Sequence, residues 1–229
     1  MEQIEMQGIA IVLMGTFNPT IITPDWLARH KIIDENEVDS SAIVVIHPEV
    51  SQFTVGDLIF EVNTERFVLH VTAEPFVRSV DIVVDIFKDK LSHTPISAMA
   101  INYLAHFKVP SHKHQTALGR ALAPLQAWAD WGQTFEADEP SKVGGLVSLT
   151  VQQSAPSDRA AGYVRCTIEP SNRIQPSGTG VFMQVNDHYS SPGAGSSVNF
   201  MEVCLDRFGP SMERSKEIVS SMIKFSESL

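Results

Sequence analysis

The side chains best suited to chemistry lie together in the run Asn186-Asp187-His188-Tyr189. An imidazole with a carboxylate beside it in the chain is suited to acid–base work near neutral pH. A Ser-, Pro- and Gly-rich stretch follows at 190–197, and a helix is expected after it, which together could present backbone N–H groups to an anion. The pattern predicts catalytic candidates Asp187 and His188, and a ligand site at Asn186, His188, Ser190, Gly193, Gly195 and Ser197.

The same segment is more typical of a turn followed by a flexible loop. The stretch at 190–197 lacks the Lys-Ser/Thr pair of a phosphate-binding loop. Successive side chains on a strand point to opposite faces, so Asp187 and His188 would not touch if both belong to a strand. The sequence therefore leaves the site and the loop interpretations both open.

His112 and His114 are the nearest approach to a metal-binding pair. Their spacing of two suits a strand, but Ser111 resembles the residue that begins a helix, and on a helix the two rings would diverge. No cysteine or suitably spaced carboxylate completes a tetrahedral set. We expect these residues to be polar positions at a helix start, and we expect no metal and no cofactor.

The run Gly15-Thr16-Phe17-Asn18-Pro19 resembles the opening of the nucleotidylyltransferases. In that family a His-x-Gly-His signature follows at once and its histidines contact the nucleotide phosphates. Here Ile21 and Pro24 occupy the two histidine positions and Thr23 the glycine position. The resemblance ends before the residues that carry the chemistry, so we interpret it as a chance match.

The elements that must position these residues follow from hydrophobic periodicity and from turn signals. Helices are expected at 25–31 after Thr23-Pro24, from Glu74 to about Phe87, at 111–131 with a kink or split at Pro124, and at 199–225, broken in two by Gly209-Pro210. Strands are expected at 8–17, 42–47, 53–62, 67–71, 96–109, 146–152, 163–168 and 181–185.

Runs of strands followed by helices favour an α+β fold, with antiparallel or mixed β-sheet layers and helices packed on one side. The order of the expected strands and helices suggests two pseudo-repeated β-β-β-α halves. We expect residues 1–229 to form a single globular unit, with sub-halves at 1–135 and 143–229 as the alternative organisation, because the polar segment 136–142 is the one credible boundary.

Composition excludes several classes of function. The chain has 229 residues, of which 43% are hydrophobic, and a formal net charge of −10. The acidic balance and scattered basic residues predict no binding to nucleic acid. No apolar stretch is long enough to span a bilayer, and the acidic N-terminus does not resemble a secretory signal. Cys166 and Cys204 are isolated, so we expect a cytoplasmic protein with reduced thiols.

Two stretches, Ile96–Tyr103 and the strand ending at Val185-Asn186-Asp187-His188-Tyr189, carry a family resemblance. They are similar to a sporadically distributed, uncharacterised prokaryotic protein family with an Asn-Tyr strand after a long helix and an Asn-Asp-His near the C-terminus. The resemblance implies a cytosolic accessory protein of a microbe and implies no reaction.

Trp128 and Trp131 lie three residues apart on an expected helix and would form a contact ridge. The leading hypothesis is therefore a non-enzymatic cytosolic interaction or assembly protein, which binds a protein partner or forms a homo-oligomer. The alternative is a small-ligand-binding or phosphoester-processing enzyme that uses Asn186, Asp187, His188 and the loop after them.

Overall fold

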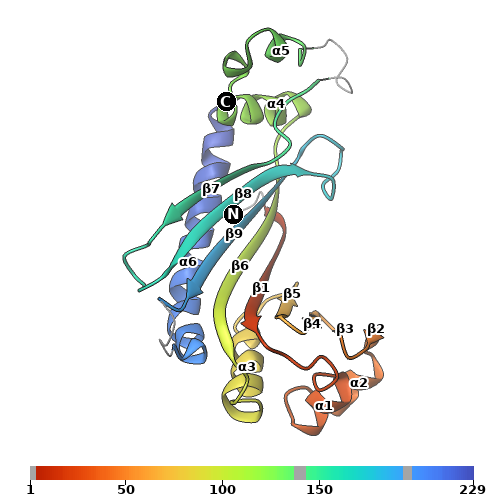
Figure 1. Cartoon of the computed structure of the whole chain (residues 1–229). Coiled ribbons are helices and arrows are strands. Elements are labelled where there is room, and N and C mark those ends of the chain that lie inside the picture. Colours follow the sequence, from red (N-terminus) through yellow and green to blue (C-terminus); the bar gives the residue numbers. More distant parts are fainter. Residues whose placement is uncertain (1–3, 137–142, 193–197) are drawn as a thin grey trace.

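The computed structural model describes residues 4–136, 143–192 and 198–229 (Figure 1). The described residues form one nine-stranded antiparallel sheet of order β2-β3-β4-β5-β1-β6-β9-β8-β7. Its strands are β1 (Ile4–Gly15), β2 (Ala42–Ile46), β3 (Val50–Val55), β4 (Leu58–Asn63), β5 (Arg66–Val71), β6 (Ile96–Lys108), β7 (Leu149–Ser154), β8 (Gly162–Ser171) and β9 (Gly180–Ser190).

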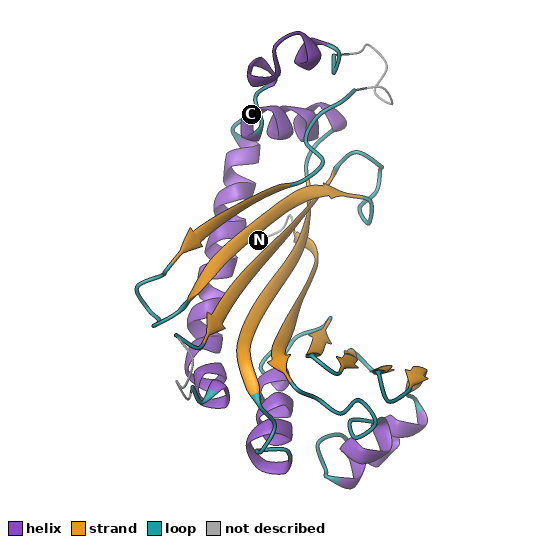
Figure 2. Ribbon diagram, viewed as in Figure 1, coloured by secondary structure: helices purple, strands orange, loops and turns teal. Residues whose placement is uncertain are grey.

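The helices cover one face of this curved sheet (Figure 2). The longest, α6, packs against β6 and β9, while α3 packs against β1 and β5. The described helical segments are α1 (Pro24–Arg29), α2 (Glu35–Asp39), α3 (Arg78–Val84) with the π-helical η1 (Asp85–Lys90), α4 (His112–Leu122), the 3-10 turn η2 (Leu125–Trp128), α5 (Ala129–Gln133) and α6 (Phe200–Glu227). The expected α+β class, with an antiparallel sheet, is confirmed.

Side-chain alternation on β6 shows how the two faces of the sheet differ. Tyr103 and Phe107 are buried beneath the helices. Asn102 and His106 alternate with them and belong to the opposite face from α3 and α6, which we call the open face. This division decides which polar residues can meet.

Aromatic side chains fill the core under the N-terminal half of the sheet. Phe53 and Phe60 stack at 4.7 Å, and Phe67 meets Phe17 and Phe87 at 6.4 and 5.0 Å between ring centroids. Phe87 comes from the π-helical continuation of α3, which keeps the predicted buried face even though the regular α-helix ends at Val84. Burial of these rings stabilises the sheet by excluding apolar surface from water.

Several predicted elements were wrong in detail: the helix expected from Glu74 begins at Arg78, and the strand expected at 181–185 runs from Gly180 to Ser190. The strand expected at 53–62 is a hairpin, because Gly56 turns the chain with a φ of +58° that side-chain-bearing residues rarely adopt. The helix expected to break at Gly209-Pro210 is continuous from Phe200 to Glu227. Both residues lie on the solvent side of the helix. Pro210 has no N–H to donate, and the backbone carbonyl that would have accepted this hydrogen bond can be solvated by water instead. The packing of α6 on the sheet then offsets the proline penalty.

Other turn and cap signals were right. Pro124 splits the helix expected at 111–131 into α4 and the short segments η2 and α5. Thr23 caps α1, since its side-chain oxygen accepts a hydrogen bond from the N–H of Trp26 at 3.2 Å. No helix among the described residues has the length and apolar character that crossing a bilayer requires.

Candidate functional site

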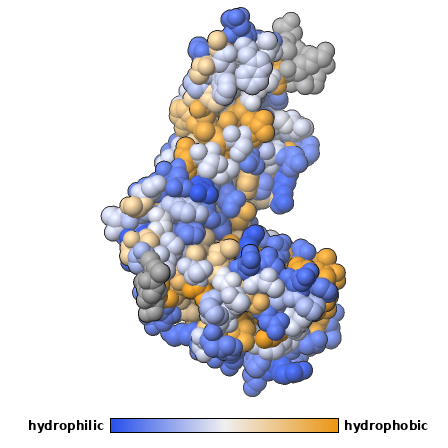
Figure 3. All heavy atoms as spheres, in the orientation of Figure 1, coloured by the Kyte–Doolittle hydropathy of each residue, from blue (hydrophilic) through white to orange (hydrophobic). Residues whose placement is uncertain are grey.

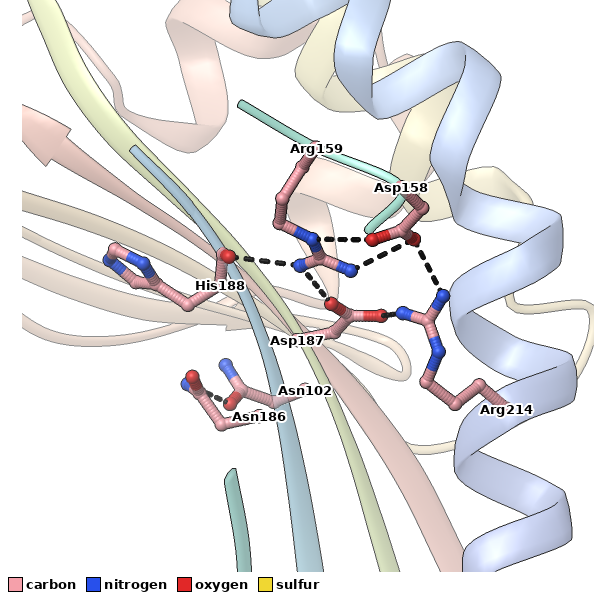
Figure 4. A network of polar contacts seen from close by, with 7 residues as sticks. All are labelled: Asn102, Asp158, Arg159, Asn186, Asp187, His188 and Arg214. Atoms are coloured by element: carbon pink, nitrogen blue, oxygen red, sulfur yellow. Dashed lines mark hydrogen bonds and ion pairs between the residues drawn. The ribbon is translucent and has the colours of Figure 1, made fainter. Parts of the chain in front are cut away.

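Asp187 lies within β9 and not at a strand end, because β9 continues to Ser190. Its side chain points to the helix-covered face and is fully buried. One carboxylate oxygen accepts a hydrogen bond from Arg159, and the other accepts one from Arg214 of α6 at 2.6 Å (Figure 4). Both oxygens are therefore occupied by guanidinium groups through charge-assisted hydrogen bonds.

Asp158 completes this ion cluster, which we define as Asp158, Arg159, Asp187 and Arg214. Asp158 accepts hydrogen bonds from Arg159 at 2.9 and 3.0 Å and from Arg214 at 2.6 Å. These bonds, that from Arg159 foremost, hold the pKa of Asp158 far below its ordinary value of 3.8. Two carboxylates balance two guanidiniums, so the ion cluster is electrically neutral.

The ion cluster joins three separate parts of the chain. Arg159 also donates to the backbone oxygen of His188 at 2.9 Å, and its guanidinium lies 4.0 Å from the ring centroid of Tyr189. Asp158 and Arg159 lie between β7 and β8, Asp187 lies on β9, and Arg214 lies on α6. The arrangement ties α6 and the β7–β8 connection to the sheet, and it leaves Asp187 no vacant oxygen for proton transfer.

His188 points to the open face, away from the ion cluster (Figure 4). Its ring stacks on the ring of its cross-strand neighbour Tyr163, with centroids 4.4 Å apart and planes 2° from parallel. The guanidinium of Arg165 lies 4.5 Å from the centroid of Tyr163. Burial, followed by the charges of Arg165 and Arg159, lowers the pKa of His188, so its ring is neutral at pH 7.

Asn186 joins His188 on the open face and bonds to Asn102 of β6. The Oδ1 of Asn102 accepts hydrogen bonds from Asn186 at 2.6 Å and from Gln184 at 3.2 Å, and its Nδ2 donates to the backbone oxygen of Ala10. Two buried atoms there, Oδ1 of Asn186 and Nδ1 of His188, have no hydrogen-bond partner among the residues that the structure describes. Such atoms are where a water or ligand polar group would be stabilised.

The structure thus brings Asn186 and His188 to one face and sends Asp187 to the other. Ser190 ends β9 and pairs with Ala98, with its N–H donating to the backbone oxygen of Ala161. Gly193, Gly195 and Ser197 lie outside the described residues. The predicted ligand-binding loop is therefore represented in the described structure by Ser190 alone.

A hollow opens on the same face, between the β8–β9 connection and the lower strands (Figure 3). It has a volume of about 630 Å³. Its lining includes Glu61, His70, Glu74, His106 and Arg173. Burial is the largest cause of the lowered pKa of both His70 and His106. Two neutral imidazoles and carboxylates thus face a space large enough for a small ligand.

Trp128 and Trp131 are 51% and 59% exposed near the end of the molecule that carries α4 and α5 (Figure 1). Their rings meet edge to face at 5.4 Å, and Trp131 meets Phe135 in the same way at 4.7 Å. We call these three residues the tryptophan patch. Mutual packing holds large aromatic side chains in place on the surface.

His112 and His114 occupy the first turn of α4, as predicted. Ser111 caps this helix, and its hydroxyl lies 2.8 Å from Nδ1 of His114. Among the residues that the structure describes, no group of three or more His, Cys, Asp or Glu side chains is arranged to hold a metal ion.

Arg159 and Arg214 were missed by the sequence reasoning, although one signal pointed to them. Asp187 falls in the inward-facing register of β9 with Val181, Met183, Val185 and Tyr189. A carboxylate in a buried register requires a cation as partner. The sequence does not say which arginine supplies it, because these partners lie 28 and 27 residues away.

No protein-family model matches the chain, and no curated protein sequence matches it. The functional interpretation therefore depends on the geometry described above.

Proposed function

We propose that this chain is a non-enzymatic interaction protein, which joins a protein partner or further copies of itself. The observation that carries the proposal is the tryptophan patch. Tryptophan is the residue most enriched among those that dominate binding energies, and large exposed aromatic groups are costly to leave in water. Trp128 and Trp131 are also held against each other, so docking would cost little side-chain entropy.

The proposal extends to an acidic accessory component of a microbial complex in the cytoplasm. It also includes the hypothesis of two pseudo-repeated halves. In support, β1 pairs with β5, after which α3 comes in the chain, and β6 pairs with β9, after which α6 comes. Central pairing of β1 with β6 would then join the two halves in one sheet.

Light scattering after size exclusion tests the proposal, together with affinity capture from the native host. We expect either a mass above the 25.2 kDa of one chain or a captured partner protein. The double variant Trp128→Ser, Trp131→Ser should weaken that association at least tenfold. Leu205→Ser, at an exposed position on α6, is the matched control and should change nothing. A monomer at high concentration that captures nothing contradicts the proposal.

A second candidate function is binding of a small ligand on the open face. The specific observation is the pair of buried, unpartnered atoms on Asn186 and His188 beside the stacked Tyr163 ring. A planar polar ligand would gain hydrogen bonds and stacking there. Phosphoester processing, the enzymatic form of this hypothesis, would have to proceed without Asp187 as its base.

A thermal-shift screen with small planar and phosphorylated compounds tests this second function. His188→Ala should remove any ligand-induced rise in Tm while leaving the protein folded. His93→Ala, at an exposed histidine, should preserve it. If no compound raises the Tm, or if His188→Ala leaves the rise intact, the open face is not the ligand site.

A further inference from the structure

The strand β2 forms one edge of the sheet and is apolar throughout. Its sequence is Ala42-Ile43-Val44-Val45-Ile46, without a charged or polar side chain. Ile43, Val44 and Ile46 are exposed, Val44 by 69%, as is Val50 on β3 beside them. Figure 3 shows an apolar area on the side of the lower lobe where Figure 1 places β2.

Edge strands of this kind are normally protected. An edge offers a row of backbone N–H and C=O groups to any passing chain, and proteins usually blunt it with lysine, proline or a short polar strand. The opposite edge of this sheet follows that rule, since β7 carries Thr150, Gln152, Gln153 and Ser154. The exposed apolar side chains of β2 therefore indicate that another polypeptide segment binds along this edge.

The charge around β2 indicates the chemistry of that occupant. Between residues 31 and 49 the sequence holds five carboxylates, at Asp34, Glu35, Glu37, Asp39 and Glu49, against Lys31 as the one lysine or arginine. The carboxylate of Glu37 is bound by Arg78 at 2.8 Å. Asp34, Glu35, Asp39 and Glu49 are exposed and flank the strand at both ends. A positively charged segment would be attracted to this edge.

The geometry disfavours a second copy of this chain as the occupant. The β2–β3 register shifts between Ile43 and Val45, so the edge bends at this bulge, which a flexible segment can follow and the rigid sheet of a second copy cannot. A five-residue edge is short for a stable dimer, which buries roughly 1,200 Å² or more.

We propose that β2 binds an extended, flexible segment of a partner protein, which adds a tenth strand to the sheet. The segment would be apolar at alternate positions, to contact Ile43, Val44 and Ile46, and would carry Lys or Arg at its ends. Backbone hydrogen bonds along β2 would give affinity, and the flanking carboxylates would give selectivity and speed of association. This inference rests on the interaction function proposed above and names a surface distinct from the tryptophan patch.

Selection from a displayed library of random twelve-residue peptides tests the inference on the full chain. We expect enrichment of peptides with alternating apolar residues between Lys or Arg. Val44→Ser should weaken their binding at least tenfold, whereas Val151→Ser, at an exposed valine on the other edge strand, should not. Glu35→Gln with Asp39→Asn should reduce both the affinity and its dependence on salt, and the bound peptide should slow hydrogen exchange of the β2 amides.

Three results of the peptide selection would overturn the inference. These are no enrichment, enrichment of acidic peptides, and binding that Val44→Ser leaves unchanged. A wild-type dimer that Val44→Ser converts to a monomer would also overturn it, because the edge would then belong to a second copy. The tryptophan variants report separately on the interaction function, so that function can hold while the β2 assignment fails.

Discussion

Asp187 is a fully buried carboxylate, and its two oxygens face the guanidinium groups of Arg159 and Arg214. Burial of a charge costs several kcal/mol unless partners compensate it. Here each charge of the ion cluster compensates another, so removal of one member leaves its neighbours buried without a counter-charge. Removing one member therefore costs more free energy of unfolding than the intact ion cluster contributes relative to an apolar cluster of the same size.

We expect Asp187→Asn to lower the free energy of unfolding by about 3–5 kcal/mol, because both arginines would lose their shared anionic partner. Urea denaturation monitored by circular dichroism measures the change. Asp206→Asn, at an exposed position of α6, serves as the control and should stay within about 0.5 kcal/mol. A loss below about 1 kcal/mol for Asp187→Asn would mean that the ion cluster contributes little to holding α6.

Asp158 gives the fold a dependence on acidic pH. Its pKa is depressed in the folded state, so the unfolded chain takes up a proton near pH 3.8 while the folded chain resists until a lower pH. The stability that Asp158 contributes is therefore present above pH 3.8 and is lost as the pH falls below it. Tm measured from pH 7 to pH 2.5 should decrease more steeply in the wild type than in Asp158→Asn. Parallel curves would contradict the assignment.

At the scale of the element, α6 shows how tertiary packing overrides local preference. Interior proline costs a helix about 3 kcal/mol, yet α6 passes through Pro210 without a break. Met201, Cys204, Met212 and Val219 are buried along the helix on both sides of that point. A break would remove one half of this stripe from the sheet.

Gly209→Ala should therefore stabilise the protein by about 0.5–1 kcal/mol, since alanine favours the helix and its added Cβ would meet no atom within 4 Å. Chemical denaturation measures the gain. Gly119→Ala in α4 is the contrasting control, because its Cβ would come within 3.2 Å of Leu146 and the helix gain should be offset. A destabilised Gly209→Ala variant would show that the glycine is needed for a bend in α6.

At the scale of the whole molecule, stability should decrease from the centre of the sheet to its edges. The strands β1, β6 and β9 have a partner on each side and lie against α3 or α6, whereas β2 has one neighbour and exposed side chains. Local opening is easiest where few apolar contacts must be broken. The edge at β2 is thus the part of the sheet most accessible to an added strand.

Hydrogen exchange followed by mass spectrometry should show this gradient. We expect amides of β2 to exchange at least about a hundredfold faster than those in the middle of β6, a difference of ~2.7 kcal/mol in opening free energy. The isolated chain at low concentration is the sample, and the same chain at high concentration is the comparison. Equal protection of β2 and β6 at low concentration would mean that the edge is already covered.

The sequence by itself determined the elements wherever a local rule operates. Alternation gave the two faces of β6, Thr23 and Pro24 gave the start of α1, and Pro124 gave the division of the helix after Ser111. Those signals depend on backbone geometry within a few residues, and at these positions no tertiary contact overrides them. They were sufficient for the α+β class and for the separation of Asp187 from His188.

Tertiary structure alone decided the rest. Asp187 became part of an ion cluster because folding brings together residues 158–159, 187 and 214, which no local spacing connects. Pro210 stays inside a helix because the sheet holds both halves of α6. Strand order, which places β2 at an open edge and β6 beside β1, follows from long-range pairing whose free energy is shared by the whole sheet. The free energy of these long-range contacts is shared among many residues. The sequence alone therefore does not show which distant residues meet, and the folded structure is needed to identify them.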